Sequence, residues 1–499
     1  MPKHSKFSDS NRREFIKTTG KVTAASALAG VALPRVHSAV DDTVKVALVG
    51  VGGRGKGAAI NALSVSAGHG LTKLVAMADV VPAQIATGLN GIKANLARKK
   101  LDVKERVDVP VDRQFIGFEG YKNAIDSLDK GDVAIFTTPP AFRWVFYKYA
   151  VERGINVFME KPVTVDGYGT KKILEINKLA KKKNLKVGVG LMCRHSRARG
   201  AMAEKIQEGV IGDIILMRSY RTSGPIASSR TILQKMLKGE EKMEEILWQI
   251  KHFHSFIWAS GGCFNDFYIH NIDECSWVKG ASMGDPNNTG GDPFDVIKTR
   301  KKWAWPLYAE ALGGKHYTKN NQGQPYVDQN LDTYSVEYTY DDGTKLIHNG
   351  RTIRECHDTF ASYIHGTKGF GVFSKNGHWP APSALYSGHT PNPKNQIWKF
   401  RARETDPYQD EWEDLLDAIR NNKPYNEAER GVLASQVCNM GRMAAHTGQR
   451  VMWDDALNAK PMAPDLDKLK GFDSKAPVTA DKDGFYPVPQ PGITKKSEY

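Results

Sequence analysis

The chain has 499 residues, of which 40% are hydrophobic and 25% charged, and its formal net charge is +15. This length suits about two globular domains. The basic residues form neither a long block nor a motif interleaved with stacking aromatics, so the charge indicates a solvated basic surface and argues against a nucleic-acid-binding protein. The five cysteines contain no C-x-x-C pair, so we expect neither a disulfide framework nor a metal site.

The first 39 residues have the composition of an export signal. Arg12 and Arg13 lie in the stretch Asn-Arg-Arg-Glu-Phe-Ile-Lys, and a 12-residue run of small and apolar residues, Val22–Leu33, follows it. This order resembles a twin-arginine signal, and its apolar run is shorter than the roughly 20 residues that span a bilayer. We therefore expect an exported, periplasmic protein. Cleavage after Ser38 and retention of the segment as a membrane anchor both stay open.

The first apolar run of strand type, Lys45–Val49, leads into a glycine-rich turn. The turn has the spacing G-x-G-x-x-G, and the residues expected to bind the cofactor there are Gly50, Gly52, Gly53, Arg54 and Gly55. Gly50 permits tight backbone geometry, Gly52 lets a pyrophosphate approach the main chain, and Gly55 lets the next helix pack closely. The free N–H groups and the dipole at the start of that helix favour the phosphate charge. The turn therefore predicts a dinucleotide site.

An acidic residue at the end of the next apolar run favours NAD over NADP. The run Leu74–Ala78 ends in Asp79, which lies 24 residues after Gly55. A carboxylate there accepts hydrogen bonds from the adenosine ribose hydroxyls and repels a 2′-phosphate.

Strands and helices then alternate up to about residue 191. We predict strands at Asp132–Phe136, Asn156–Met159 and Lys186–Leu191, and helices at about 92–104, 121–128, 142–152 and 169–183. Such alternation predicts a doubly wound parallel sheet with right-handed crossovers. We therefore expect a Rossmann domain over residues 43–191.

The second half of the chain is expected to form a different kind of α/β domain, over residues 192–460. Strand-like runs occur at 214–220, 334–340 and 344–348, and the last two flank the hairpin signal Asp341-Asp342-Gly343. These runs predict a largely antiparallel sheet, with long insertions at 222–262 and 280–330. Helices are expected at about 412–419 and 427–447. The Pro- and Lys-rich residues 461–499 suggest an extended tail.

Four segments, in this order, resemble the Gfo/Idh/MocA family (glucose-fructose oxidoreductase, inositol dehydrogenase and MocA). They are the glycine turn, Thr138-Pro139-Pro140, Glu160-Lys161-Pro162, and residues 261–273 with the pattern Gly-Gly-x(3)-Asp-x(3)-His. The resemblance extends over about residues 43–456. It implies a Rossmann domain followed by an α/β domain with an open, largely antiparallel sheet. It also implies that NAD(P) and a sugar-like or polyol substrate meet between the two.

The resemblance also implies roles for particular residues. Lys161 matches the family's active-site lysine, and Asp266 and His270 match its Asp-x-x-x-His pair. Glu160 and the Thr138–Pro140 turn would lie along the nicotinamide end of the cofactor.

The residue types fit this chemistry. Oxidation of an alcohol needs a base for the hydroxyl proton, and histidine is the natural candidate. Helical spacing would place Asp266 beside His270 to fix its tautomer, and Lys161 would stabilise negative charge on the substrate oxygen. Arg194 and His195, after the last Rossmann strand, are further candidates for substrate contacts. The stretch His252-Phe253-His254 suggests aromatic lining of a carbohydrate pocket, or simple packing, rather than a metal site.

The leading hypothesis is an exported NAD-dependent dehydrogenase of a sugar, polyol or derivative, expected to be a homo-oligomer. One alternative is an NAD-dependent glycosidase that oxidises its sugar transiently and eliminates the aglycone. A third is a non-catalytic sugar-binding protein that holds a nucleotide.

Overall fold

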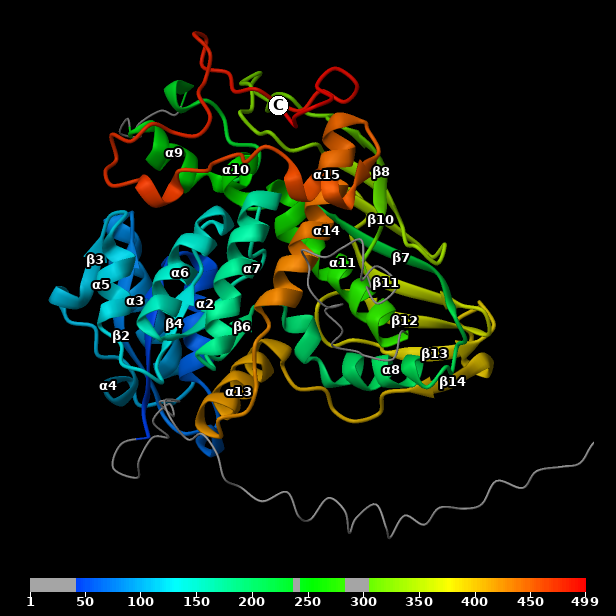
Figure 1. The fold of residues 1–499 in the computed structure, drawn as a ribbon, viewed down its shortest axis with the longest axis horizontal. Coiled ribbons are helices and arrows are strands. Elements are labelled where there is room, and N and C mark those ends of the chain that lie inside the picture. The colour runs from blue at the N-terminus through cyan, green and yellow to red at the C-terminus, as the bar shows by residue number, and fades with distance from the viewer. Residues whose placement is uncertain (1–41, 237–242, 283–304) are drawn as a thin grey trace, which may run out of the picture.

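The computed structural model describes residues 42–236, 243–282 and 305–499 (Figure 1). The predicted twin-arginine segment, residues 1–39, lies outside these ranges. Among the helices in these ranges, none combines the length and the apolar character needed to span a membrane.

The first sheet is parallel and has six strands in the order β3-β2-β1-β4-β5-β6. Its strands are β1 (Val44–Val49), β2 (Thr72–Asp79), β3 (Gln114–Ile116), β4 (Val133–Phe136), β5 (Asn156–Met159) and β6 (Val187–Val189). The order reverses between β1 and β4, which is the switch point where doubly wound sheets bind ligands. The predicted Rossmann fold is confirmed.

Helices cover both faces of this sheet. One face carries α2 (Gly53–Leu63), α3 (Pro82–Arg98) and α13 (Pro407–Arg420), and the other carries α5 (Gly120–Asp126), α6 (Arg143–Arg153) and α7 (Gly167–Lys182). Helix α13 comes from the second half of the chain, and its Trp412 stacks on Phe158 of β5 with ring centroids 4.4 Å apart. The short helix α4 (Val103–Arg106) precedes β3. The second half of the chain therefore contributes to the core of the first.

The second sheet has nine strands in the order β14-β13-β12-β11-β7-β10-β9-β8-β15, and only the β7–β10 pair is parallel. The predicted, largely antiparallel sheet is confirmed, including the hairpin of β9 and β10 around Gly343. The strands are β7 (Ile214–Ser223), β8 (Tyr308–Gly314), β9 (Thr333–Thr339), β10 (Lys345–Thr352), β11 (Thr359–Gly366), β12 (Gly369–Lys375), β13 (Ala384–Ser387), β14 (Gln396–Lys399) and β15 (Val451–Met452).

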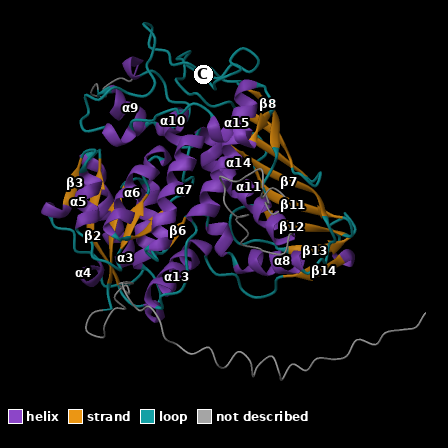
Figure 2. Cartoon of the chain, viewed as in Figure 1, coloured by secondary structure: helices purple, strands orange, loops and turns teal. Residues whose placement is uncertain are grey.

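Helices lie on the side of this sheet that faces the first domain, as Figure 2 shows. They are α8 (Arg197–Gln207), α11 (Gly262–Ser282) and α14 (Ala428–Thr447), with α15 (Trp453–Asn458) beyond them. Two short helices, α9 (Glu245–Lys251) and α10 (Ile257–Ser260), lie in the insertion after β7 and stand above the carboxyl ends of the Rossmann strands (Figure 1).

The C-terminal segment, expected to be an extended tail, has little regular structure but is firmly anchored. It passes close to α9, where Gln249 donates to the carbonyl of Val478 at 2.7 Å. Near its end, Glu498 accepts hydrogen bonds from Arg442 at 2.8 Å and His446 at 2.7 Å on α14. All three side chains are buried. A composition typical of disorder is therefore offset here by a buried ion pair.

Candidate functional site

The glycine turn is tight on one side and open on the other. Gly50 has a φ of +93°, and a Cβ built there would lie 2.6 Å from the amide nitrogen of Thr138. A Cβ on Gly55 would lie 2.1 Å from the carbonyl oxygen of Gly50. Gly52 has no atom within 4 Å of such a Cβ, and it lines a cavity. Gly53 begins α2, whose first turn has no side-chain cap, so its N–H groups suit an anion.

Asp79 ends β2 at the wall of the same cavity. Its carboxylate accepts the N–H of Val51 at 2.6 Å and the N–H of Val81 at 2.9 Å, one on each oxygen. Burial raises the pKa of Asp79, and the backbone N–H groups oppose that rise. Each oxygen has a second lone pair, so the carboxylate retains acceptors for a pair of hydroxyl groups.

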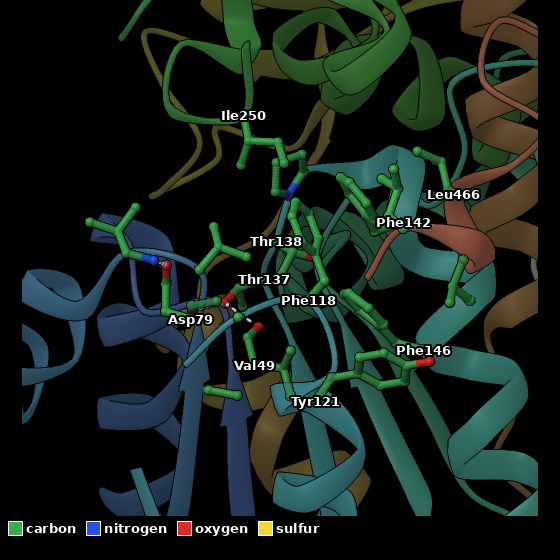
Figure 3. A pocket seen from close by; sticks show the side chains of 18 of the residues that line it. Val49, Asp79, Phe118, Tyr121, Thr137, Thr138, Phe142, Phe146, Ile250 and Leu466 are labelled. Carbon is green, nitrogen blue, oxygen red and sulfur yellow. Dashed lines mark hydrogen bonds between the residues drawn. The ribbon is translucent and has the colours of Figure 1, made fainter. Parts of the chain in front are cut away.

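The cavity beside the turn has a volume of about 180 Å³ and is open to solvent. It runs from Gly50, Gly52 and Asp79 past Thr138 and Pro139 to an apolar part (Figure 3). The rings in that part are those of Phe118, Tyr121, Phe142 and Phe146. Its roof comes from elsewhere in the chain, with Ile250, Lys251 and Phe253 from the insertion and Leu466, Asp467 and Leu469 from the C-terminal segment. Its position at the carboxyl ends of the Rossmann strands suits a cofactor.

A buried arginine ties together the two turns that follow β4 and β5. Arg143 donates to the carbonyl of Thr138 at 2.6 Å and to the carbonyl of Glu160 at 3.1 Å. Burial lowers the pKa of Arg143 to about 10, against the opposing effect of Glu160 and Asp266. Arg143 therefore holds in place the two backbone turns that the family resemblance puts along the nicotinamide end of the cofactor.

Arg54 and Glu160, both expected to bind the cofactor, pair with each other. The Nε of Arg54 lies 2.5 Å from Glu160, and its Nη2 lies 3.4 Å from the buried Glu411. Burial lowers the pKa of Arg54, but the two carboxylates outweigh it and raise the pKa overall. Arg54 also lies 4.8 Å over the ring of Tyr408.

Lys161 and Asp266 form the ion pair at the centre of the candidate site, with Nζ 3.0 Å from Oδ1. The second oxygen of Asp266 accepts a hydrogen bond from Nε2 of His254 at 3.1 Å, and Nδ1 of His254 contacts Ser228 Oγ at 3.0 Å. Burial raises the pKa of Asp266, but Lys161 and His254 outweigh it and hold that pKa well below its ordinary value.

The expected pairing of Asp266 with His270 is therefore wrong. The two residues share a face of α11, but helical side chains lean toward the helix N-terminus. This direction carries the carboxylate of Asp266 to Lys161 and to His254, which lies just before α10. Nδ1 of His270 is buried and has no hydrogen-bond partner among the described residues.

His270 lies beside a second histidine. Its ring centroid is 4.7 Å from that of His378, which in turn packs 4.6 Å from Phe360. Burial holds the pKa of His270 well below its ordinary value, and His378, Lys161 and Arg221 act in the same direction. His270 is consequently a neutral imidazole at neutral pH, able to accept a proton.

Arg194 and His195 do not have the arrangement expected of substrate ligands. Arg194 makes a two-pronged ion pair with the buried Asp273, at 2.9 and 2.7 Å. The ring of His195 lies 2.7 Å from Asp414 and 3.1 Å from Glu427. Burial lowers the pKa of His195, but Glu427 and Asp414 outweigh it and raise that pKa to about 9. The side chains of Arg194 and His195 are therefore engaged in ion pairs with other parts of the chain.

Sequence reasoning missed several residues of the site. His254 belongs to the stretch that was expected to line a carbohydrate pocket or to pack in the core. No residue near it in the sequence indicated its hydrogen bond to Asp266. Arg143, Arg221 and His378 carried no motif at all. Their proximity arises from the packing of α6 on the first sheet and of α11 on the second.

Comparisons with known proteins agree with the predicted fold. Residues 44–191 match the family model described as "Oxidoreductase family, NAD-binding Rossmann fold" (GFO_IDH_MocA). No curated protein sequence matches the chain.

Similar solved structures cover most of the chain. A scyllo-inositol dehydrogenase from Lactobacillus casei has 21% identity and a TM-score of 0.51, over 83% of this chain and 98% of that one. An aldose-aldose oxidoreductase from Caulobacter crescentus has 13% identity and a TM-score of 0.55, over 82% and 99%. A levoglucosan dehydrogenase in complex with NADH and levoglucosan has 15% identity and a TM-score of 0.54, over 82% and 99%. At these identities the similarity extends the shared fold beyond residue 191.

Residues 44–191 therefore match an NAD-binding Rossmann domain of the Gfo/Idh/MocA oxidoreductase family, and the chain joins that domain to a second one built around a largely antiparallel sheet.

Proposed function

We propose that the protein is an NAD-dependent dehydrogenase that oxidises a carbinol of a sugar, polyol or derivative. The observation that carries the proposal is the Lys161–Asp266 ion pair next to the neutral, buried imidazole of His270. Lys161 follows β5 directly, at the carboxyl edge of the sheet where the glycine turn and the cavity lie.

The residues around the cavity suit a dinucleotide. Gly52 leaves room for a pyrophosphate, the uncapped start of α2 supplies N–H donors, and Asp79 supplies acceptors for ribose hydroxyls. NAD⁺, when bound, supplies the acceptor for a hydride. The apolar side chains of the roof would cover part of the bound cofactor.

The protein side chains handle the hydroxyl group of the substrate. The carbinol loses a hydride from carbon and a proton from oxygen, and so becomes a carbonyl. Nδ1 of His270, which has no partner among the described residues, accepts the proton. The ammonium of Lys161 donates to the same oxygen and stabilises its negative charge, while Asp266 and His254 hold that ammonium in place.

The test uses the full chain with NAD and a panel of sugars and polyols, with NADH absorbance as the readout. Lys161→Met should reduce turnover about 10²- to 10³-fold and His270→Gln about 10²- to 10⁴-fold. Both should keep NAD binding, measured as NAD-dependent stabilisation against unfolding. Lys205→Met, which removes a surface lysine paired with Glu208, is the matched control. Full turnover in both site variants would refute the proposal.

The same panel separates the alternatives. An NAD-dependent glycosidase would release free sugar from an aryl glycoside without net NADH, and a binding protein would bind sugars without any hydride transfer. Two of the similar structures are named as inositol and levoglucosan dehydrogenases, which supports net oxidation for this chain.

We also propose export through the twin-arginine route. Support comes from Arg12, Arg13 and the apolar run Val22–Leu33. Replacement of both arginines by lysine should retain the protein in the cytoplasm of a producing bacterium. Unchanged appearance in the periplasmic fraction would contradict the proposal.

A further inference from the structure

Arg221 differs from the other cations near the candidate site, because it has no anionic partner. Lys161 pairs with Asp266 at 3.0 Å, and Arg199 pairs with Glu274 at 2.9 Å, where both side chains are fully buried. The side chain of Arg221 has no carboxylate within 4 Å and donates no hydrogen bond in residues 42–236, 243–282 and 305–499, and its Nε is buried. Its guanidinium lies 5.0 Å over the ring of Phe360.

The strand register places Arg221 on the face of the second sheet that α11 covers. Arg221 lies opposite Gly350 of β10 and Phe360 of β11, and residues opposite each other share a face. A Cβ on Gly350 would lie 2.3 Å from the ring of Tyr268, so that ring rests on Gly350 beside Arg221. Tyr268 lies on α11 between Asp266 and His270. The second sheet thus places the charged side chain of Arg221 next to α11, the helix that carries Asp266 and His270.

A chain of contacts connects Arg221 with the reacting groups. Phe360 lies under Arg221 and against His378, and His378 lies against His270. On its other side, Nδ1 of His378 is 3.5 Å from the hydroxyl of Tyr408. The guanidinium of Arg54 lies over the ring of Tyr408. The network therefore runs without a break from the Arg54–Glu160 pair at the cofactor edge to Arg221.

Four buried polar atoms in this network have no hydrogen-bond partner among the described residues. They are Nδ1 of His270, Nε2 of His378, Nε of Arg221 and the hydroxyl oxygen of Tyr268. Buried polar groups in proteins are nearly always paired, and a group of unpaired ones points to a ligand that supplies the partners. Two of the four, Nε of Arg221 and the hydroxyl of Tyr268, can donate a hydrogen bond whatever the tautomers of the two histidines, so the complementary ligand offers acceptors to them.

We propose that the substrate is an acidic sugar, and that Arg221 binds its carboxylate while Lys161 and His270 act on a carbinol of the same molecule. The planar fork of arginine matches a carboxylate in a two-pronged geometry. A bound carboxylate also supplies the negative charge that Arg221 lacks. This inference rests on the proposed oxidation for the position of the carbinol.

The test compares matched pairs of sugars that differ only at C6, glucuronate with glucose and galacturonate with galactose, using the full chain with NAD. Equilibrium binding by calorimetry and initial rates of NADH formation are both measured. The acidic member of at least one pair should bind at least tenfold more tightly. Arg221→Gln should lower binding and kcat/KM for that acid about 10- to 100-fold, and change those for the neutral sugar less than about threefold.

Two further variants show whether the effect of Arg221→Gln comes from the loss of an arginine at this position. Arg218→Gln removes an arginine from the opposite face of β7, where it contacts His365. This variant should change neither the binding nor the kcat/KM of the acidic or the neutral sugar. Arg221→Lys keeps the charge without the fork and should give an intermediate loss, with an unchanged unfolding temperature. The inference is overturned if no pair shows an Arg221-dependent gain for the acid. A preference for the 6-sulfate ester over the uronate would overturn the carboxylate assignment.

The two readouts separate this inference from the proposed function. If the acid binds through Arg221 but no NADH forms, the oxidation is wrong and the anion site stands. If neutral sugars alone give NADH, and Arg221→Gln slows them as much as it slows acids, the anion site is wrong and the oxidation stands.

Discussion

Gly52 offers the sharpest test of where the pyrophosphate of the cofactor lies. A Cβ on Gly52 has no atom within 4 Å, and its φ of −69° is ordinary for any residue. Gly52→Ala should therefore leave the nucleotide-free protein as stable as before, or more stable by up to about 1 kcal/mol, because alanine restricts the unfolded chain. The added methyl group points into space that a bound pyrophosphate would need.

The expected size of the effect follows from linkage. NAD at 100 times its Kd stabilises the folded protein by about 2.7 kcal/mol. If the methyl group weakens binding about 30-fold, or about 2 kcal/mol, the same concentration is only about three times the new Kd. The stabilisation then falls to about 0.9 kcal/mol. Urea unfolding with and without NAD measures both values.

Gly55 provides the contrast within the same motif. Its Cβ would lie 2.1 Å from the Gly50 carbonyl oxygen and 2.7 Å from Thr137 Oγ1, so Gly55→Ala should destabilise the protein by about 1–3 kcal/mol even without NAD. A Gly52→Ala variant that keeps the full NAD-dependent stabilisation would refute the placement of the pyrophosphate. A Gly52→Ala variant that is less stable than wild type without NAD would refute the conclusion that a side chain fits at Gly52.

Three further predictions concern the buried polar groups. His254→Phe removes the donor to Asp266 and should lower kcat/KM about 10- to 100-fold with little change in NAD binding, as steady-state rates and NAD titration will show; an unchanged rate would contradict the role. The pKa of His195 is raised to about 9, so its charged form contributes about 3 kcal/mol to the free energy of unfolding. This contribution is complete below about pH 6.5 and is lost as the pH rises through about 9. The stability difference between wild type and His195→Gln in urea unfolding should therefore shrink over that range, and a constant difference would contradict this. Glu498→Gln leaves Arg442 buried without a charged partner and should cost about 3–5 kcal/mol in the same assay, whereas a cost below about 1 kcal/mol would show that the C-terminal anchor is weak.

Local sequence signals predicted most strands of the first sheet and three strands of the second, but the helix expected at about 92–104 is found at Pro82–Arg98, with a separate short helix at Val103–Arg106. The apolar run before Gly50 and the acidic end of the next strand predicted β1, the turn and Asp79 in their observed places. The Asp341–Gly343 signal predicted the β9–β10 hairpin, because hairpin turns depend on a few adjacent residues. Such features are encoded within about ten residues of each other.

The polar connections of the site could not be predicted in this way. The same spacing that places Asp266 and His270 on one face of α11 leaves the direction of each side chain unspecified. That direction depends on which partners other segments bring, and Lys161 is 105 residues away from Asp266. Arg194 and His195 were misjudged for the same reason, since Asp273, Asp414 and Glu427 come from distant helices. Long-range ion pairs leave no periodic signal along the chain.

The insertion after β7 makes the cofactor cavity and the catalytic cluster parts of one structure. Phe253 lines the cavity, and the next residue, His254, holds Asp266, which holds Lys161. If a cofactor in this cavity contacts Phe253, it therefore lies one peptide unit and two contacts away from Lys161, the lysine proposed to act on the substrate. The family model ends at residue 191, before this segment begins. The contacts of Lys161 thus involve a segment outside the matched Rossmann domain, and the roles proposed for Lys161 and His270 have to be tested in the full chain.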